Sequence, residues 1–237
     1  LNAKRVEIPA KNYGNDLTDF LKAISPKTKL IYIANPNNPT GSFLSAVEIA
    51  NFLAQVPPQV IVALDEAYVE FTEPSERVDS FGLVAKYPNL IVCRTLSKAY
   101  GLAGLRIGYA VSSTEIAGLL NRVRQPFNCN SLALAAATAA IQDDEFVAKV
   151  AENNRVGLQL LQNFFDEKGL RYVPSKGNFV MLDLQQPAAP IYQALLRKGV
   201  IVRPLAGYGL PNHLRISIGL PEESQRFLTA LSDILGL

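Results

Sequence analysis

Short, nearly continuous apolar segments alternate with amphipathic segments through the first half of the chain. The apolar segments are rich in β-branched residues and predict strands at residues 5–8, 29–35, 60–66, 90–96 and 107–111. Two of the amphipathic segments, residues 44–55 and 80–87, have helical periodicity. Because buried apolar strands that alternate with helices are typical of parallel sheets, this half predicts an α/β fold with a mostly parallel sheet covered on both faces.

The pattern changes in the second half of the chain. A long helix is expected over residues 143–168, with Gly169 as its C-cap. After it the pattern predicts a strand, a helix, two strands and a helix, at residues 171–184, 189–199, 200–205, 213–219 and 222–235. We therefore expect a large α/β domain over residues 1–142 and a smaller α+β C-terminal domain over residues 143–237, the latter including the long linking helix.

Composition narrows the possible functions. The chain has 237 residues, 49% of them hydrophobic, and a net charge of +2 without a basic block, so neither nucleic acid nor a membrane is an expected partner. The longest apolar run, residues 131–141, is shorter than the roughly 20 residues that span a bilayer and predicts a buried alanine-rich helix. The two cysteines, Cys93 and Cys129, belong to no metal-binding motif, and Cys93 is expected in the core of a strand. Without an apolar leader at residues 1–10, we expect a cytoplasmic protein.

Polar residues follow three of the predicted strands. They are Asn35 to Gly41, Asp65 to Tyr68 and Thr95 to Lys98. Ligands of open α/β sheets bind at the carboxyl ends of the strands, so these three segments are the candidate site.

Lys98, Asp65 and Tyr68 are the candidate reactive groups of these segments. A lysine held at a strand end can act as a nucleophile and form a Schiff base, although a lone lysine is more often an ordinary surface residue. Asp65 follows a fully apolar strand and needs a cationic partner or hydrogen bonds, which a protonated pyridine nitrogen, a structural ion pair or a helix N-terminus could each supply. Tyr68 could donate to a ligand oxygen or be a core tyrosine.

The remaining candidates are polar groups for ligand binding. Asn38 lies in the turn sequence NPNNPTG and could donate its amide to a ligand, although a plain turn also explains this sequence. Arg106, with the hydroxyls of Thr95 and Ser97, could bind a phosphate. Neither GxxxxGK[ST] nor GxGxxG is present, which argues against ATP or NAD chemistry.

Six motifs in one order carry a resemblance to a known family. They are NPNNPTG, DEAYVEF, RTLSKAYGLAGLRIGY, VRQPFNCNSLALAAATAAI, KGNFVML and LRISIG. Each is weak alone, but the ordered set resembles the class-II aminotransferases of fold type I, which depend on pyridoxal 5'-phosphate (PLP), and within them the histidinol-phosphate aminotransferases. The resemblance extends along nearly the whole chain.

The resemblance implies a role for each matching residue. Lys98 would bind PLP covalently and later move a proton, Asp65 would pair with the pyridine nitrogen, and Asn38 and Tyr68 would hydrogen-bond its 3-hydroxyl. Ser97 and Arg106, with Thr95 as a further candidate, would hold the cofactor phosphate.

The substrate side of the site is also implied by the resemblance. Arg215 and Arg203 would bind the acidic group of the substrate, although surface ion pairs are an alternative, and Asn178 would line the substrate channel. The implied substrates are histidinol phosphate and glutamate/2-oxoglutarate, and the implied assembly is a homodimer.

The family pattern also includes an N-terminal part that this sequence does not contain. The chain could be a fragment, half of a nicked enzyme or a truncated relative. The alternatives to the aminotransferase interpretation are another PLP enzyme of the same fold, such as an aromatic aminotransferase or a threonine-phosphate decarboxylase, and an inactive fragment that cannot hold the cofactor.

Overall fold

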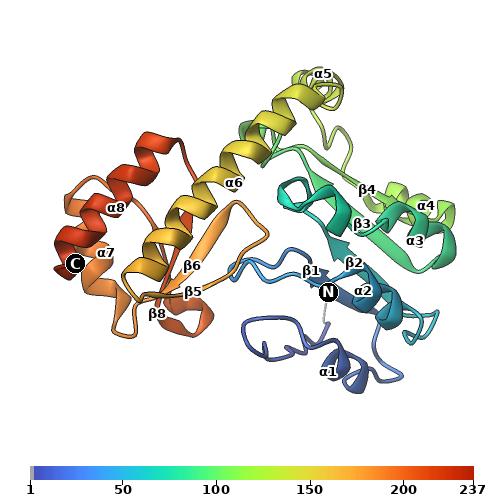
Figure 1. The fold of residues 1–237 in the computed structure, drawn as a ribbon. Coiled ribbons are helices and arrows are strands. Elements are labelled where there is room, and N and C mark those ends of the chain that lie inside the picture. Colours follow the sequence, from blue (N-terminus) through green and yellow to red (C-terminus); the bar gives the residue numbers. More distant parts are fainter. Residues whose placement is uncertain (1–2) are drawn as a thin grey trace. The chain divides into compact units, whose positions relative to one another are not determined.

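The computed structural model describes residues 3–237, which form two compact units (Figure 1). The first unit contains the residues up to Asn37 together with Phe43–Asp144. The second contains Glu145–Leu237 and also the short segment Asn38–Ser42. The chain therefore divides close to residue 144, and one predicted ligand segment is shared between the two units.

The first unit is built on a four-stranded sheet in the order β1-β2-β3-β4 (Figure 1). Strands β1 (Leu30–Ala34), β2 (Ile61–Asp65) and β3 (Leu90–Thr95) are parallel, and β4 (Gly108–Ser112) pairs antiparallel with β3. The mixed, mostly parallel sheet confirms the predicted α/β class. The expected first strand at residues 5–8 is wrong, since these residues lie outside any strand and the nearby chain forms only the isolated bridge Lys11–Gly14.

One face of this sheet carries the core of the unit. Side chains of alternate strand positions, among them Ile33, Leu64 and Val92, pack with those of α1 (Leu17–Lys22), α2 (Ala46–Leu53) and α3 (Ser80–Lys86). On the opposite face Leu30 and Tyr32 are more than half exposed. The prediction of a sheet covered on both faces is wrong for the described residues. The parallel strands β1, β2 and β3 lie across the sheet in the order of the sequence. When each strand is added on the same side of the previous one, right-handed crossovers place the connecting helices on the same face of the sheet.

The connection from β3 to β4 holds Lys98. It contains the 3₁₀ turn η3 (Ala103–Leu105) and packs through Leu96 and Ile107 against α5 (Ser131–Ala140), which follows α4 (Thr114–Val123). Helix α5 is not the buried helix that was predicted. Only Ala133 and Ala137 of α5 are buried, because only this face of the helix meets the β3–β4 connection.

Two short 3₁₀ turns, η1 (Val69–Phe71) and η2 (Pro74–Glu76), link β2 to α3. The predicted strand residue Cys93 lies in β3 and is half-buried, on the same face as Tyr32.

The second unit is an antiparallel sheet packed against three helices. The sheet order is β5-β6-β8-β7. Its elements are α6 (Asp144–Glu167), β5 (Arg171–Val173), β6 (Phe179–Asp183), α7 (Ala188–Arg197), β7 (Arg203–Leu205), η4 (Ala206–Tyr208), β8 (Leu210–Ser217) and α8 (Pro221–Leu235). The core combines residues of α6, α7 and α8, such as Phe165, Leu195 and Leu231, with Leu182 and Leu214 of the sheet.

Two predictions in the second unit have different outcomes. Gly169 ends α6 in the left-handed region, at φ +62°, and Leu170 N donates to Phe165 O at 2.8 Å, which confirms the predicted C-cap. The single strand expected over residues 171–184 is in fact two antiparallel strands. The chain turns at residues 174–178, where Pro174 has no N–H to donate and Gly177 N donates to Ser175 Oγ at 3.0 Å.

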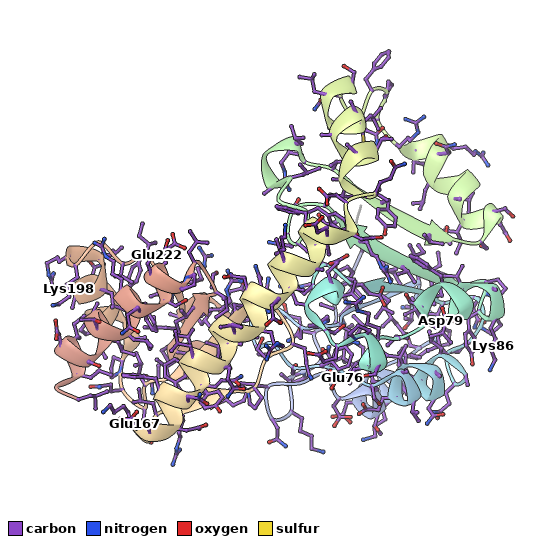
Figure 2. All side chains as sticks on the ribbon, turned by 45° about the horizontal axis from the view of Figure 1, so that its top comes forward. Glu76, Asp79, Lys86, Glu167, Lys198 and Glu222 are labelled. Atoms are coloured by element: carbon purple, nitrogen blue, oxygen red, sulfur yellow. The ribbon has the colours of Figure 1, made fainter. Side chains whose placement is uncertain are left out.

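Charged residues mark several helix ends, as the labelled side chains in Figure 2 illustrate. Asp79 caps the N-terminus of α3 and Lys86 lies in its last turn, while Glu222 lies in the first turn of α8. These signs complement the helix macrodipole. Among the described residues, no helix is both long enough and apolar enough to cross a membrane.

Candidate active site

The carboxyl ends of the three parallel strands lie level with one another. Asn35 N donates to Asp65 O, and Glu66 N donates to Cys93 O, both at 2.9 Å, so the ladder continues just past the strand ends. Asp65 at the end of β2 and Thr95 at the end of β3 therefore lie at one edge of the sheet, as the strand pattern predicts.

The Asp65 carboxylate is held by two hydrogen bonds from its own unit. Its Oδ1 accepts from Ala67 N at 3.0 Å, and its Oδ2 accepts from the Tyr32 hydroxyl. No lysine or arginine of the described residues forms an ion pair with it, and the turn η1 that follows has no side-chain cap. Neither structural alternative for Asp65, the ion pair or the helix cap, is found in the described chain.

The Tyr32 contact was not predicted. Partial burial of the phenol raises the pKa of Tyr32, and the hydrogen bond to Asp65 raises it further, so the hydroxyl keeps its proton well above neutral pH. The sequence gives no signal for this contact, because it depends on the register that pairs Ala34 of β1 with Asp65 of β2, and periodicity does not fix a register.

Lys98 lies one turn beyond β3. The backbone turns directly after it, with Gly101 N donating to Lys98 O at 3.0 Å, and the side chain is exposed. Its Nζ lies 5.3 Å from the centre of the Tyr68 ring, a cation–π contact with a buried tyrosine. Within the described chain no carboxylate pairs with this ammonium. The structure thus brings together two of the predicted site residues, Lys98 and Tyr68.

Thr95, Ser97 and Arg106 flank the start of the β3–β4 connection. Leu96 N donates to Ile107 O at 3.2 Å, which places Ser97 and Arg106 on the two sides of one backbone pairing. The Thr95 hydroxyl accepts from Ser97 N at 3.1 Å, whereas the Ser97 hydroxyl forms no hydrogen bond within the described residues. Arg106 has a left-handed backbone, at φ +53°, and its exposed guanidinium donates to Ala103 O at 2.9 Å.

The edge of the first unit thus offers a set of unlike polar groups. Asp65 provides a carboxylate that has no cationic partner among the described residues, and Lys98 provides an amine. Arg106 provides a guanidinium, and Ser97 on the paired segment provides a hydroxyl. This set suits a ligand with a protonated ring nitrogen, a carbonyl carbon and a phosphate.

A buried charged network lies directly beside this edge and was missed in the sequence. Glu66 Oε2 accepts hydrogen bonds from Arg94 Nε at 2.9 Å and from Ser80 Oγ at 3.0 Å, and it lies 2.9 Å from Arg94 Nη2 in an ion pair. The Arg94 guanidinium also lies 4.3 Å from the centre of the Phe81 ring. Burial raises the pKa of Glu66, and Arg94 opposes that rise. The network ties the start of the DEAY segment to α3.

The second unit holds the other four predicted residues. Arg203 on β7 pairs in register with Arg215 on β8, so the two side chains belong to one face of the sheet. Arg215 Nη1 donates to Asn38 Oδ1 at 2.6 Å, and its guanidinium lies 4.9 Å from the Phe179 ring. No carboxylate of the described residues pairs with either arginine, so the alternative of surface ion pairing is not supported.

A cavity of about 370 Å³ opens between these two arginines. It is lined by Tyr192, Ile201, Val202, Arg203, Pro204, Arg215 and Ser217. The lining includes two guanidiniums and two hydroxyl-bearing residues, Tyr192 and Ser217, which favours a phosphate or carboxylate ligand.

The segment that carries Asn38 is fixed to the second unit through Gly41. Lys176 N donates to Gly41 O at 2.9 Å, and Gly41 has φ +82°. A Cβ at this position would lie only 2.2 Å from Ser175 Oγ, so glycine is required. Asn178 ends the same turn, directly before β6, and its backbone O accepts a hydrogen bond from Ile218 N at 2.9 Å.

Comparison with known proteins agrees with the sequence motifs. The sequence model of the family "Aminotransferase class I and II" matches residues 2–231. The chain is 78% identical over its whole length to "Histidinol-phosphate aminotransferase 2" of Pasteurella multocida, covering 65% of that protein, and 70% identical over 99% of its length to the protein of the same name from Haemophilus influenzae, covering 64% of it.

The solved structures agree as well. A histidinol-phosphate aminotransferase from Sinorhizobium meliloti, in complex with pyridoxal-5'-phosphate, superposes with a TM-score of 0.89 at 32% identity, over 98% of this chain and 64% of that one. The chain thus spans about two thirds of the length of the relatives it matches. It belongs to the class I and II aminotransferase family and has its fold type I architecture.

Proposed function

We propose that the chain carries the cofactor and substrate residues of a histidinol-phosphate aminotransferase, which moves an amino group between histidinol phosphate and 2-oxoglutarate with PLP. The observation that carries this proposal is Asp65, a carboxylate at a strand end that has no cationic partner in the described chain, at the same sheet edge as the exposed amine of Lys98. The names and identities of the relatives support the substrate class.

The residues of the first unit fit PLP. Asp65 would hold the ring nitrogen in its protonated state, and Ser97 and Arg106 would bind the phosphate, with Thr95 orienting Ser97 through its backbone N–H. Tyr68 and Asn38 would donate to the 3-hydroxyl, and the Asn38 amide keeps its N–H groups because Arg215 uses only its Oδ1. When bound, PLP supplies the electron sink for the substrate carbon.

Lys98 would act twice. Its amine is the group that binds the cofactor carbonyl, and once substrate has released it, the amine can take the proton from the substrate carbon and deliver it to the cofactor. Contact with the Tyr68 ring fixes the direction of this flexible side chain.

The paired arginines would bind the acidic end of the substrate. Arg203 and Arg215 line one cavity, and their summed charge of +2 matches a phosphate monoester. Asn178, directly before β6 in the same unit, would line the path of the substrate. We further propose that the working enzyme is a homodimer; the cytoplasmic location stays a prediction.

The test is a comparison of substrates on one preparation. With PLP added, the chain should convert 2-oxoglutarate to glutamate with histidinol phosphate as donor, and the variant Lys98→Ala should not. An aromatic amino acid as the better donor, or carbon dioxide released from O-phosphothreonine, would instead assign one of the related PLP activities. No product with any of the three would favour the inactive fragment.

A further inference from the structure

Tyr32 lies on the face of the first unit's sheet opposite its core, and the residue is more than half exposed. It is on β1, two residues before Ala34, and Ala34 pairs in register with Asp65 of β2. Residues two apart on a strand point to the same face, so the phenol reaches diagonally across to the Asp65 carboxylate and donates to Oδ2.

The two donors on Asp65 come from different directions. The Ala67 N–H belongs to the turn that follows β2, whereas the Tyr32 hydroxyl comes from the neighbouring strand. One hydrogen bond would leave a carboxylate free to rotate about its Cβ–Cγ bond, but two donors on the two oxygens fix the plane of the group. Each oxygen keeps a second lone pair for a ligand.

We propose that Tyr32 is a positioning residue that fixes the orientation of the Asp65 carboxylate toward the pyridine nitrogen of the cofactor. The contact between Tyr32 and Asp65 is observed, and its role toward the cofactor rests on the proposed function. The hydroxyl can donate this hydrogen bond across the physiological pH range, because its partial burial and the neighbouring carboxylate raise the pKa of the Tyr32 phenol.

The chain offers a matched control in its other unit. Tyr172 OH donates to Asp166 Oδ2 at 3.2 Å, a second tyrosine–aspartate hydrogen bond, but one on the surface of α6 and β5. Tyr172→Phe removes the same group from the same type of contact, in the unit that does not contain Asp65.

The first experiment measures the affinity of the full chain for PLP in a double-mutant cycle. Tyr32→Phe should weaken binding about tenfold, the effect of one hydrogen bond to a charged group, and Tyr172→Phe should leave it unchanged. In the Asp65→Ala background, Tyr32→Phe should have no further effect, because Tyr32 acts only through Asp65. An equal loss in both backgrounds, or no loss in the wild-type background, would overturn the assignment.

The second experiment needs no cofactor. Ultraviolet titration of the phenol, assigned by subtraction of the Tyr32→Phe spectrum, should give a lower pKa for Tyr32 in Asp65→Asn than in the wild-type chain. An unchanged titration would overturn the contact itself. If the wild-type chain binds no PLP, the proposed function fails, and this titration alone decides whether Tyr32 holds Asp65.

Discussion

Arginines occur in two opposite settings in this molecule. Arg94 in the first unit is enclosed by Glu66, Ser80 and the Phe81 ring, and its carboxylate partner has a side chain only 2% exposed. Arg203 and Arg215 in the second unit lie side by side across two strands, and the described chain offers them an amide, an aromatic ring and a cavity but no carboxylate. Because the charge of Arg94 is neutralised within the protein by Glu66, we expect this pair to stabilise the fold. Two like charges left together without a counterion would suit the negatively charged ligand that we propose for them.

The largest effect is expected from breaking the internal pair. Glu66→Ala leaves Arg94 half-buried without its carboxylate, which should lower the free energy of unfolding by about 3–5 kcal/mol. Glu152→Ala is the matched control, because it removes an exposed pair with Arg155 and should cost less than about 1 kcal/mol. Urea unfolding of both variants measures the difference. Equal losses would show that burial does not distinguish the two pairs.

The arginines of the second unit should behave in the opposite way. Arg215→Met and Arg203→Met should each weaken binding of inorganic phosphate about tenfold or more while changing the free energy of unfolding by less than about 1 kcal/mol. The titration is best followed by phosphorus NMR in an Arg106→Met background, so that only the second unit is probed. Arg171→Met, an exposed arginine on β5, is the control. A large loss of stability without a change in phosphate affinity would assign these arginines to the framework.

A smaller change in the free energy of unfolding is expected at Glu70, a buried carboxyl group of which one oxygen has no hydrogen-bond partner among the described residues. Glu70 Oε2 has no hydrogen bond within the described residues, and burial raises the pKa of Glu70. An acid with a raised folded-state pKa contributes its full stability below the unfolded value of about 4.5 and loses it as the pH rises through the folded pKa.

Glu70→Gln removes this titration. It should match the wild-type chain at acidic pH and exceed its free energy of unfolding by about 1 kcal/mol at neutral pH. Urea unfolding at the two pH values measures this, with the exposed Glu73→Gln as the control. A variant that is less stable than wild type at neutral pH would show that the Glu70 charge has a stabilising partner.

Local pattern predicted most of the framework and the residue types of the site. The segments rich in β-branched residues correctly predicted β1 to β4, and Gly169 correctly predicted the end of α6. Both features depend on residues close together in the sequence. The prediction of a single strand over residues 171–184 was wrong because it passed over the turn sequence at residues 174–178, where Pro174 and Gly177 separate two apolar segments.

Long-range contacts could not be predicted in the same way. Arg94 with Glu66, Tyr32 with Asp65 and Arg215 with Asn38 join residues 28, 33 and 177 positions apart. They depend on the order and register of strands, which periodicity alone does not fix.

The central claim is that the sheet edge at Asp65, Lys98 and Arg106 holds PLP. The most direct measurement is borohydride reduction of the chain with PLP, followed by intact mass and peptide mapping. A mass increase of one reduced pyridoxyl phosphate group per chain, located on Lys98 and lost in Lys98→Ala, is the predicted result. No increase, or label spread over other lysines and unaffected by Lys98→Ala, would contradict the account.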